Sequence, residues 1–148
     1  MGNQVRALAI CLFRRGERIL VAEGYDPVKR ETFYRPLGGG IEFGERGEET
    51  IQRELREEIQ AEVADVHYLF TFENIYVFNG EPGHEIAMVY DGRLVDESLY
   101  GREHIEGTEL GAPEGAAFQA VWKSLSDFGE GKDILYPEKL LEALAANR

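Results

Sequence analysis

Three glutamates, Glu54, Glu57 and Glu58, have the spacing that would let their carboxylates act together on a metal ion. In a helix, a turn of about 100° per residue places them within an arc of about 100°. Carboxylates so close repel one another, by about 0.2–0.5 kcal/mol per pair at this spacing, unless a cation lies between them. Their oxygens are ligands that Mg²⁺ prefers, and Mn²⁺ can take its place. The sequence therefore predicts a Mg²⁺ site, with Mn²⁺ as a substitute, on one face of a helix.

Two neighbouring features fit the same chemistry but also have simpler explanations. Gly38, Gly39 and Gly40 lack Cβ atoms, so their backbone can approach a metal ion or a phosphate closely, although three glycines can also form a plain turn. Arg53 precedes Glu57 by four residues and either offsets part of the repulsion or forms an ordinary surface ion pair. The alternative for the glutamates themselves is a solvated acidic helix face.

A helix from about Gly47 to Gln60 is predicted to carry these carboxylates. Ile51, Leu55 and Ile59 recur every four residues and form one apolar stripe. The stripe would pack on a core and leave the three carboxylates beside it.

The segments before this helix predict strands and a loop. Val5–Phe13 and Arg18–Ala22 are rich in apolar residues and flank a turn at 14–17, which predicts a hairpin. Residues 24–40 mix proline, glycine, charges and aromatics without a period. We therefore expect a long loop there, with at most a short strand at Phe33–Leu37.

The segments after the helix predict two long strands, a short strand and a last helix. In order along the chain these are Val66–Phe78, a turn at 79–83, Glu85–Val95, a loop at 96–116, Phe118–Trp122 and a helix from Pro137 to Ala146. Leu140, Leu141 and Leu144 lie on one side of the last helix. This order of elements predicts an α/β fold in which helices pack on a mixed sheet.

The glycines, glutamates and arginine together match the signature of a known family. This segment resembles the Nudix hydrolase signature and agrees with it at seven of nine specified positions. The match begins with Gly39, continues with Glu45 after five intervening residues and then, after seven more, with the residues at 53–58. The two departures are Gln60, where the family has glycine, and Ala61, where it has a large aliphatic residue. The match covers the 23 residues from Gly39 to Ala61. Leu37 stands where many members have proline.

Resemblance to the Nudix hydrolases implies an α/β/α sandwich and a particular reaction. That reaction is hydrolysis of the pyrophosphate bond of a nucleoside diphosphate linked to another group, as in a nucleoside triphosphate, a nucleotide sugar or a dinucleoside polyphosphate. Water attacks phosphorus with the help of a divalent metal, which neutralises charge and lowers the pKa of the attacking water.

The resemblance also implies roles for individual residues. Glu54, Glu57 and Glu58 match the family's metal-ligand positions, and the glycine loop at Gly39 lies beside them in the sequence. Glu45 would support the site from the loop, and Arg53 would hold the acidic side chains in place. Which glutamate acts as the general base is left open.

Tyr34 and Arg35 are candidates for binding the substrate together with Gly38 and Gly39. An aromatic ring beside a guanidinium suits stacking on a base and contact with a phosphate. The alternative is that the aromatic residues of this segment, which include Phe33, simply pack on the core.

Two further acidic residues are candidates for an additional metal ligand. Glu114 lies roughly where relatives often bring such a ligand from a loop, but an accidental Glu is an equal alternative in a chain with 28 acidic residues. Glu85 follows His84 at the start of a strand, where a satisfied pair at the strand end is the alternative.

Composition limits the other possibilities. The 148 residues are 43% hydrophobic and 30% charged, which predicts one folded domain over residues 1–148. The net charge of −12 opposes binding to nucleic-acid duplexes and to anionic membranes, so a phosphate substrate would need a cation beside it. Cys11 is the single cysteine, and the sequence shows neither a signal-peptide pattern nor a membrane span, so we expect a cytoplasmic protein.

Two other functions stay open beside hydrolysis. One is a module that keeps the fold and senses a nucleotide without turnover, and the other is an acidic protein that binds a basic partner. A homodimer is also open, because the apolar strand Tyr68–Phe78 can pair with a second copy or face the core.

Overall fold

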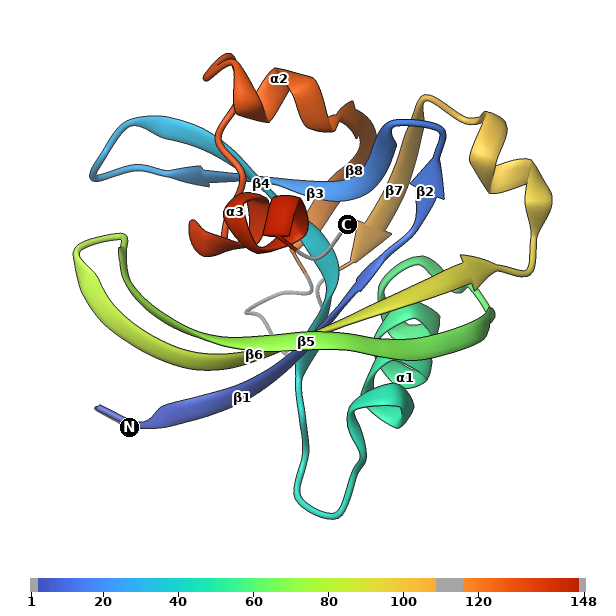
Figure 1. Cartoon of the computed structure of the whole chain (residues 1–148), viewed down its shortest axis with the longest axis horizontal. Coiled ribbons are helices and arrows are strands. Elements are labelled where there is room, and N and C mark those ends of the chain that lie inside the picture. Colours follow the sequence, from blue (N-terminus) through green and yellow to red (C-terminus); the bar gives the residue numbers. More distant parts are fainter. Residues whose placement is uncertain (1–2, 109–115, 147–148) are drawn as a thin grey trace.

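A mixed β-sheet with helices on both faces forms the computed structural model, which describes residues 3–108 and 116–146 (Figure 1). The strands are β1 Val5–Leu12, β2 Arg14–Arg15, β3 Arg18–Asp26, β4 Glu31–Gly40, β5 Val63–Phe78, β6 Glu81–Leu94, β7 His104–Thr108 and β8 Ala117–Ser124. The helices are α1 Gly47–Ile59, the 3₁₀ helix η1 Glu97–Gly101, α2 Leu125–Gly129 and α3 Lys139–Ala146. The strand order is β5-β6-β1-β4-β3-β8-β7, and β2 pairs with β3.

Strand β4 connects the two halves of the sheet. Its residues Leu37–Gly40 pair with β1, whereas Glu31–Pro36 pair with β3. The β1–β6 pair is parallel, and the other pairs are antiparallel. The sheet is therefore mixed, as predicted, and its halves separate where β4 passes from β1 to β3.

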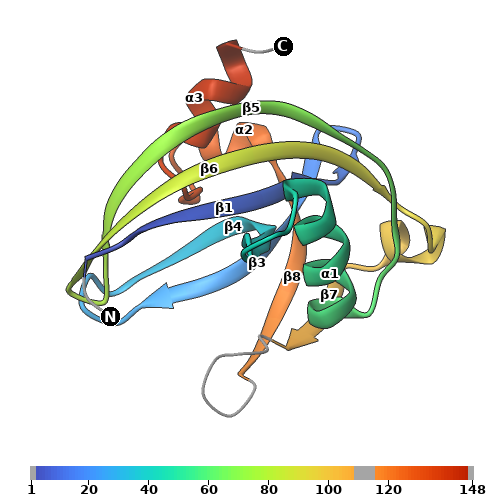
Figure 2. The same ribbon diagram turned by 90° about the horizontal axis from the view of Figure 1, so that it is seen from below.

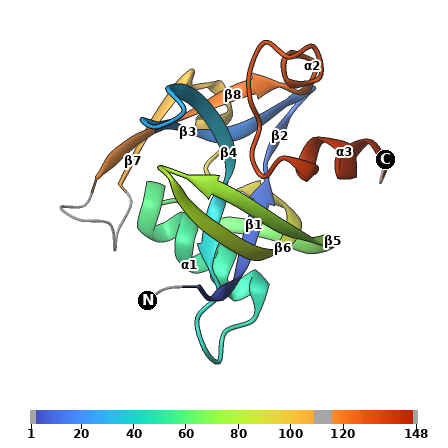
Figure 3. The same ribbon diagram turned by 90° about the vertical axis from the view of Figure 1, so that its left-hand side faces the viewer.

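Alternate residues of β1 face two different core layers. Ala9 and Cys11 belong to a buried cluster that includes Ile51 of α1, whereas Leu8 and Ile10 belong to a second cluster that includes Leu140 of α3. Figure 3 shows α1 and α3 on opposite sides of β1. The predicted α/β/α arrangement is confirmed.

Helix α1 confirms the helix predicted from the four-residue apolar period. Ile51 and Leu55 are fully buried. At its start, the Glu49 carboxylate accepts a hydrogen bond from the Arg46 backbone N–H at 2.8 Å. At its end, Gln60 adopts φ 57° and its N–H donates to the Arg56 carbonyl at 3.0 Å. Gln60 thus takes the left-handed conformation that glycine adopts most easily.

Two predictions for the first forty residues are wrong. The hairpin expected between the first two apolar segments does not join β1 to β3, because β4 lies between these strands in the sheet. The short strand β2 pairs with β3 instead. The expected long loop at 24–40 is instead the end of β3, a short turn and the whole of β4, which contains and extends the short strand expected at Phe33–Leu37. Strand β4 lacks the alternation of buried and exposed residues that a strand with one exposed face would show. Its buried residues include Phe33, Tyr34, Pro36 and Leu37.

The predictions for the later segments agree better with the structure. Strands β5 and β6 pair antiparallel and are joined by Asn79 and Gly80, which both have positive φ as in a type I′ turn. Strand β8 and helix α3 lie where they were expected, but the expected loop at 96–116 contains η1 and β7. Among the described helices, none has the length and apolar character needed to cross a membrane.

Candidate metal and substrate site

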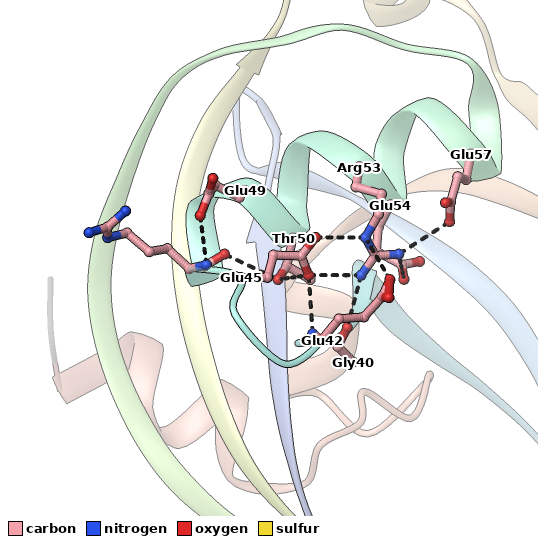
Figure 4. Close-up of polar contacts among 9 residues, drawn as sticks. Gly40, Glu42, Glu45, Glu49, Thr50, Arg53, Glu54 and Glu57 are labelled. Carbon is pink, nitrogen blue, oxygen red and sulfur yellow. Dashed lines mark hydrogen bonds and ion pairs between the residues drawn. The ribbon is translucent and has the colours of Figure 1, made fainter.

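Arg53 is the centre of the acidic site on α1 (Figure 4). Its Nε donates to Glu45 Oε2 at 2.7 Å, and its Nη1 donates to Glu54 Oε1 at 2.9 Å and to Glu57 Oε2 at 3.3 Å. Its Nη2 donates to the Gly40 carbonyl at 3.1 Å. One guanidinium therefore joins the glycine loop, the loop before α1 and two of the predicted metal ligands.

Glu45 supports this arrangement from the loop, as the family resemblance implies. Its Oε1 accepts hydrogen bonds from Arg53 Nη2 at 3.0 Å and from the Thr50 hydroxyl at 2.7 Å, and it also accepts the Glu42 backbone N–H at 3.1 Å. The hydrogen bonds from Arg53 lower the pKa of Glu45 from 4.5 to about 2, although partial burial acts in the other direction. The same pairing raises the pKa of Arg53 above its ordinary value.

Glu54 lies against Gly39, and this contact explains the glycine. A Cβ placed on Gly39 would lie 2.5 Å from the carboxylate carbon of Glu54, so only glycine leaves room for that side chain. Burial raises the pKa of Glu54 above its usual value, and the Glu57 charge adds to this, while Arg53 and Arg35 act to lower it. A partly buried carboxylate beside other carboxylates is a place where a further cation would be favourable.

The third predicted ligand, Glu58, is buried with 7% of its surface exposed. Together with Glu57, it follows Glu54 on the same helix, as the spacing requires. Within residues 3–108 and 116–146, no three His, Cys, Asp or Glu side chains lie close enough to hold a metal ion as they stand. Arg53 binds both Glu54 and Glu57 in this structure. The predicted ligand Glu114 lies outside the described residues.

The residues present nevertheless fit a divalent cation. Arg53 forms ion pairs with Glu42, Glu45, Glu54 and Glu57, so one positive charge faces four negative charges. Oxygen donors with an excess of negative charge are the donor set for a hard divalent ion. The missing side chain at Gly39 leaves room for the Glu54 carboxylate itself.

A cleft of about 570 Å³ runs beside the acidic helix, a volume typical of small-molecule sites. Its lining includes Gly38 and Glu58, which belong to β4 and to α1. The lining also includes Phe33, Phe78 and Tyr136, which contact one another with ring centroids 5.8 Å and 5.1 Å apart. The cleft therefore connects the acidic site with an aromatic end.

The two hairpins that flank the cleft meet at its aromatic end. Figure 2 shows the tips of β3–β4 and β5–β6 at the same end of the molecule. Asp26 of β3, with 1% of its surface exposed, accepts a hydrogen bond from the Asn79 backbone N–H at 3.1 Å. Asp26 also accepts the N–H groups of Val28 and Lys29 in its own turn.

Two arginines line the cleft, and only one of them is a substrate residue predicted from the sequence. Arg35, a predicted substrate residue, lines the cleft and acts electrostatically on both Glu54 and Tyr76. Arg6 also lines it, and a Cβ on Gly40 would lie 2.7 Å from its Nη2. The register that pairs Leu8 with Gly40 explains how Arg6 reaches this place, but the sequence carries no local signal for that pairing.

Tyr34 does not share the position expected for it. Its ring packs near Phe128 in the layer of α2 and α3, its hydroxyl donates to Glu23, and Lys123 Nζ lies 4.7 Å from its ring centroid. Adjacent strand residues face opposite sides, so Phe33 and Arg35 line the cleft and Tyr34 does not. The Tyr34 side chain therefore lies on the opposite face of β4 from Phe33 and Arg35, outside the cleft lining.

Other proteins resemble this chain in sequence and in fold. A family model described as the NUDIX domain matches residues 2–141. The NAD-capped RNA hydrolase NudC of Pectobacterium carotovorum is 36% identical over 66 residues, which make up 45% of this chain and 25% of that protein. This chain thus spans about a quarter of the length of that relative.

Solved structures give the same result for the fold. A NUDIX hydrolase from Nitrosomonas europaea has a TM-score of 0.66 and 12% identity, with 98% of this chain and 92% of that chain covered. An ADP compounds hydrolase has a TM-score of 0.58 and 16% identity, with 99% and 71% covered. The fold and the acidic helix are those of the Nudix class. The chain belongs to the NUDIX domain family, as its signature between Gly39 and Ala61 predicted.

Proposed function

We propose that this protein, as a single Nudix domain over residues 1–148, hydrolyses the pyrophosphate bond of a nucleoside diphosphate linked to another group. The observation that supports this most is the Arg53 network, which gathers Glu45, Glu54 and Glu57 of the signature beside a cleft of suitable size. The names of the relatives, an NAD-capped RNA hydrolase and an ADP compounds hydrolase, agree with nucleotide substrates.

The signature residues divide into ligands and supports. Glu54, Glu57 and Glu58, with the backbone at Gly39, would hold Mg²⁺ or Mn²⁺. The bound cation supplies charge neutralisation and a more acidic attacking water. Arg53 and Glu45 keep the ligands in place through the hydrogen bonds described above.

The cleft residues bind and orient the substrate. Arg35 and Arg6 supply positive charge for the phosphates in a chain whose net charge is otherwise −12. Gly38 also lines the cleft and is retained as a proposed contact of the substrate. A carboxylate of the acidic helix accepts the proton of the attacking water, and the choice among the three glutamates is open.

Glu57→Gln tests this function most directly. We expect the native chain to hydrolyse some of a panel of nucleoside triphosphates, nucleotide sugars and dinucleoside polyphosphates with Mg²⁺ or Mn²⁺, and none with EDTA. Loss of one ligand carboxylate should lower kcat by about 10²- to 10⁴-fold. The control is Glu48→Gln, an exposed residue in the first turn of the same helix, which should retain native rates.

The outcome also separates the other candidates. Nucleotide binding without turnover in the native chain would favour the sensing module. If neither a divalent metal nor any nucleotide bound, the glutamates would be a solvated acidic face and hydrolysis would be rejected.

Location and assembly stay predictions. The cytoplasm is the proposed location, because Cys11 is buried and is the single cysteine of the chain. A homodimer through β5 is also retained as a prediction, since β5 lies at one edge of the sheet and exposes Ile75 and Val77.

A further inference from the structure

Two buried polar side chains lie side by side in the floor of the cleft. Asn74 of β5 and Glu85 of β6 are partners in the strand register, so their side chains point to the same face of the sheet. Asn74 is 8% exposed and Glu85 is 9% exposed, and both line the cleft. Neither residue belongs to the Nudix signature.

The protein itself uses little of their hydrogen-bonding capacity. Glu85 Oε2 accepts a hydrogen bond from the Tyr76 hydroxyl at 3.3 Å. Within the described part of the chain, the Asn74 side-chain amide makes no hydrogen bond to another residue. The remaining polar atoms of the pair are not fully buried, so they face the space of the cleft. At the floor of a cleft, a bound molecule can provide the missing partners.

The surroundings of this pair favour a flat, aromatic molecule. Phe33 and Phe78 meet edge to face, and Phe33 also contacts Tyr136. Tyr76, which bonds Glu85, lines the same cleft. Aromatic rings beside a few placed polar groups are typical of sites that bind a planar base.

The chemistry of the pair distinguishes between the bases. A carboxylate only accepts hydrogen bonds, whereas an amide both donates and accepts. Guanine offers two adjacent donors, N1–H and N2–H₂, which one carboxylate can accept together, and its O6 accepts from an amide. Adenine and cytosine place an acceptor beside their amino group, and uracil has a single N–H between two carbonyls. Each of those three bases would leave the carboxylate poorly paired.

We propose that Glu85 and Asn74 select a guanine nucleoside as the part of the substrate held in the cleft. This inference rests on the proposed function, because it concerns the nucleoside of the same substrate. Glu85 accepts from N1–H and N2–H₂, the Asn74 amide donates to O6, and the neighbouring aromatic rings contact the base. Both residues act in specificity and take no part in the reaction at phosphorus.

Binding measured without turnover tests the proposal separately from hydrolysis. The native chain is titrated with GDP, ADP, CDP and UDP in EDTA by isothermal calorimetry. We expect GDP to bind about 10- to 100-fold more tightly than the other three, the range that a good bidentate base contact supplies. In Glu85→Gln, an amide NH₂ group replaces one of the two carboxylate oxygens that accept hydrogen bonds from guanine. The preference for GDP should therefore disappear.

Two further variants make the test specific to the base. Asn74→Ala removes the donor for O6 without adding a charge beside Glu85, and it should weaken GDP binding while leaving ADP binding nearly unchanged. Glu73→Gln is the control, because Glu73 precedes Asn74 on the same strand, is exposed and faces the other side. Circular dichroism of each variant confirms that it is folded.

The possible outcomes separate the two proposals. Equal binding of the four nucleotides, or a preference that survives Glu85→Gln in the folded variant, would overturn the inference. Hydrolysis without any base preference would reject the inference and keep the function. A preference for GDP that Glu85→Gln removes, in a chain that hydrolyses nothing, would keep the inference and reject the function.

Discussion

Gly38 and Gly39 are neighbours in β4, yet the atoms around them differ in kind. A Cβ on Gly38 would lie 2.1 Å from the backbone carbonyl oxygen of Ala9 in the paired strand β1. A Cβ on Gly39 would meet the flexible end of the Glu54 side chain. Backbone in a sheet cannot move aside, whereas a carboxylate can rotate away. The first glycine therefore maintains the sheet, and the second maintains the position of Glu54, a proposed metal ligand.

Alanine substitution should separate these two roles. Gly39→Ala is expected to unfold within a few degrees of the native melting temperature but to lose about 10-fold or more in kcat, because Glu54 must move. Gly38→Ala should lower the melting temperature markedly, because the new methyl group collides with β1 and the φ of 146° is also unfavourable. Thermal unfolding and rates measured on the same samples check both. Equal loss of stability in the two variants would contradict this division.

At the scale of the element, the end of α1 shows where this chain departs from its family. Gln60 has φ 57°, and its N–H still donates to the Arg56 carbonyl. The family signature has glycine at this position, and the structure keeps the same left-handed conformation with a glutamine. The left-handed conformation is therefore set by the end of the helix. Gln60, which has a Cβ, adopts it at a cost in free energy that glycine would not have.

Restoring glycine should stabilise the protein. Gln60→Gly is expected to raise the free energy of unfolding by about 0.5–1 kcal/mol, since left-handed backbone is unfavourable for residues with a Cβ. Gln52→Gly, within the same helix, should lower it by about 1 kcal/mol. Urea denaturation of both variants measures the two changes in the free energy of unfolding. A destabilised Gln60→Gly would mean that the glutamine side chain makes a stabilising contact that outweighs the strain.

Elements differed in how well the sequence could predict them. Helix α1 was predictable because Ile51, Leu55 and Ile59 recur every four residues, a spacing that places them on one face of a helix. Strand β4 was predicted only as a short strand at Phe33–Leu37, because consecutive buried residues, among them Pro36, hide the alternation of a strand. The pairing of β4 between β1 and β3 joins segments that are distant in the chain, and local patterns do not encode it.

The candidate site shows the same limit. The clustering of the helix glutamates with Arg53 was predictable because these residues lie on a single element with a regular period. Arg6 and Asn74 reach the cleft through the strand register and have no local signal in the sequence, whereas Glu85 was a candidate only as a metal ligand. Residues that a helix brings together can be found by counting, but residues that a sheet brings together require the strand order.

At the scale of the whole molecule, Asp26 joins the two hairpins that flank the cleft. Burial alone would raise the pKa of Asp26, but the N–H groups of Asn79, Lys29 and Val28 outweigh it, so the net pKa lies below the usual 3.8. The unfolded chain then binds a proton before the folded chain does as the pH falls. The stabilisation from Asp26 is complete above about pH 3.8 and is lost as the pH falls through the lower folded-state pKa.

Asp26→Asn should make the acid unfolding less steep. We expect the variant to be less stable than the native chain at pH 7, with a difference that shrinks below pH 4, and its Asn79 amide should exchange faster with deuterium. The control Glu106→Gln changes an exposed carboxylate on β7 and should follow the native profile. Urea unfolding at several pH values and hydrogen exchange supply the data. Unchanged protection of Asn79 would show that other contacts hold the hairpins together.

Arg53 also bears on how the protein responds to its surroundings. Its guanidinium already binds two of the proposed ligands and the glycine loop, so an internal cation holds the acidic helix in place. Domains that depend on a metal for folding lose their structure in chelator. This chain, by contrast, should keep its fold in EDTA and recover activity as soon as Mg²⁺ returns. Its activity would then follow the free concentration of the ion from moment to moment, while the amount of folded protein stays constant.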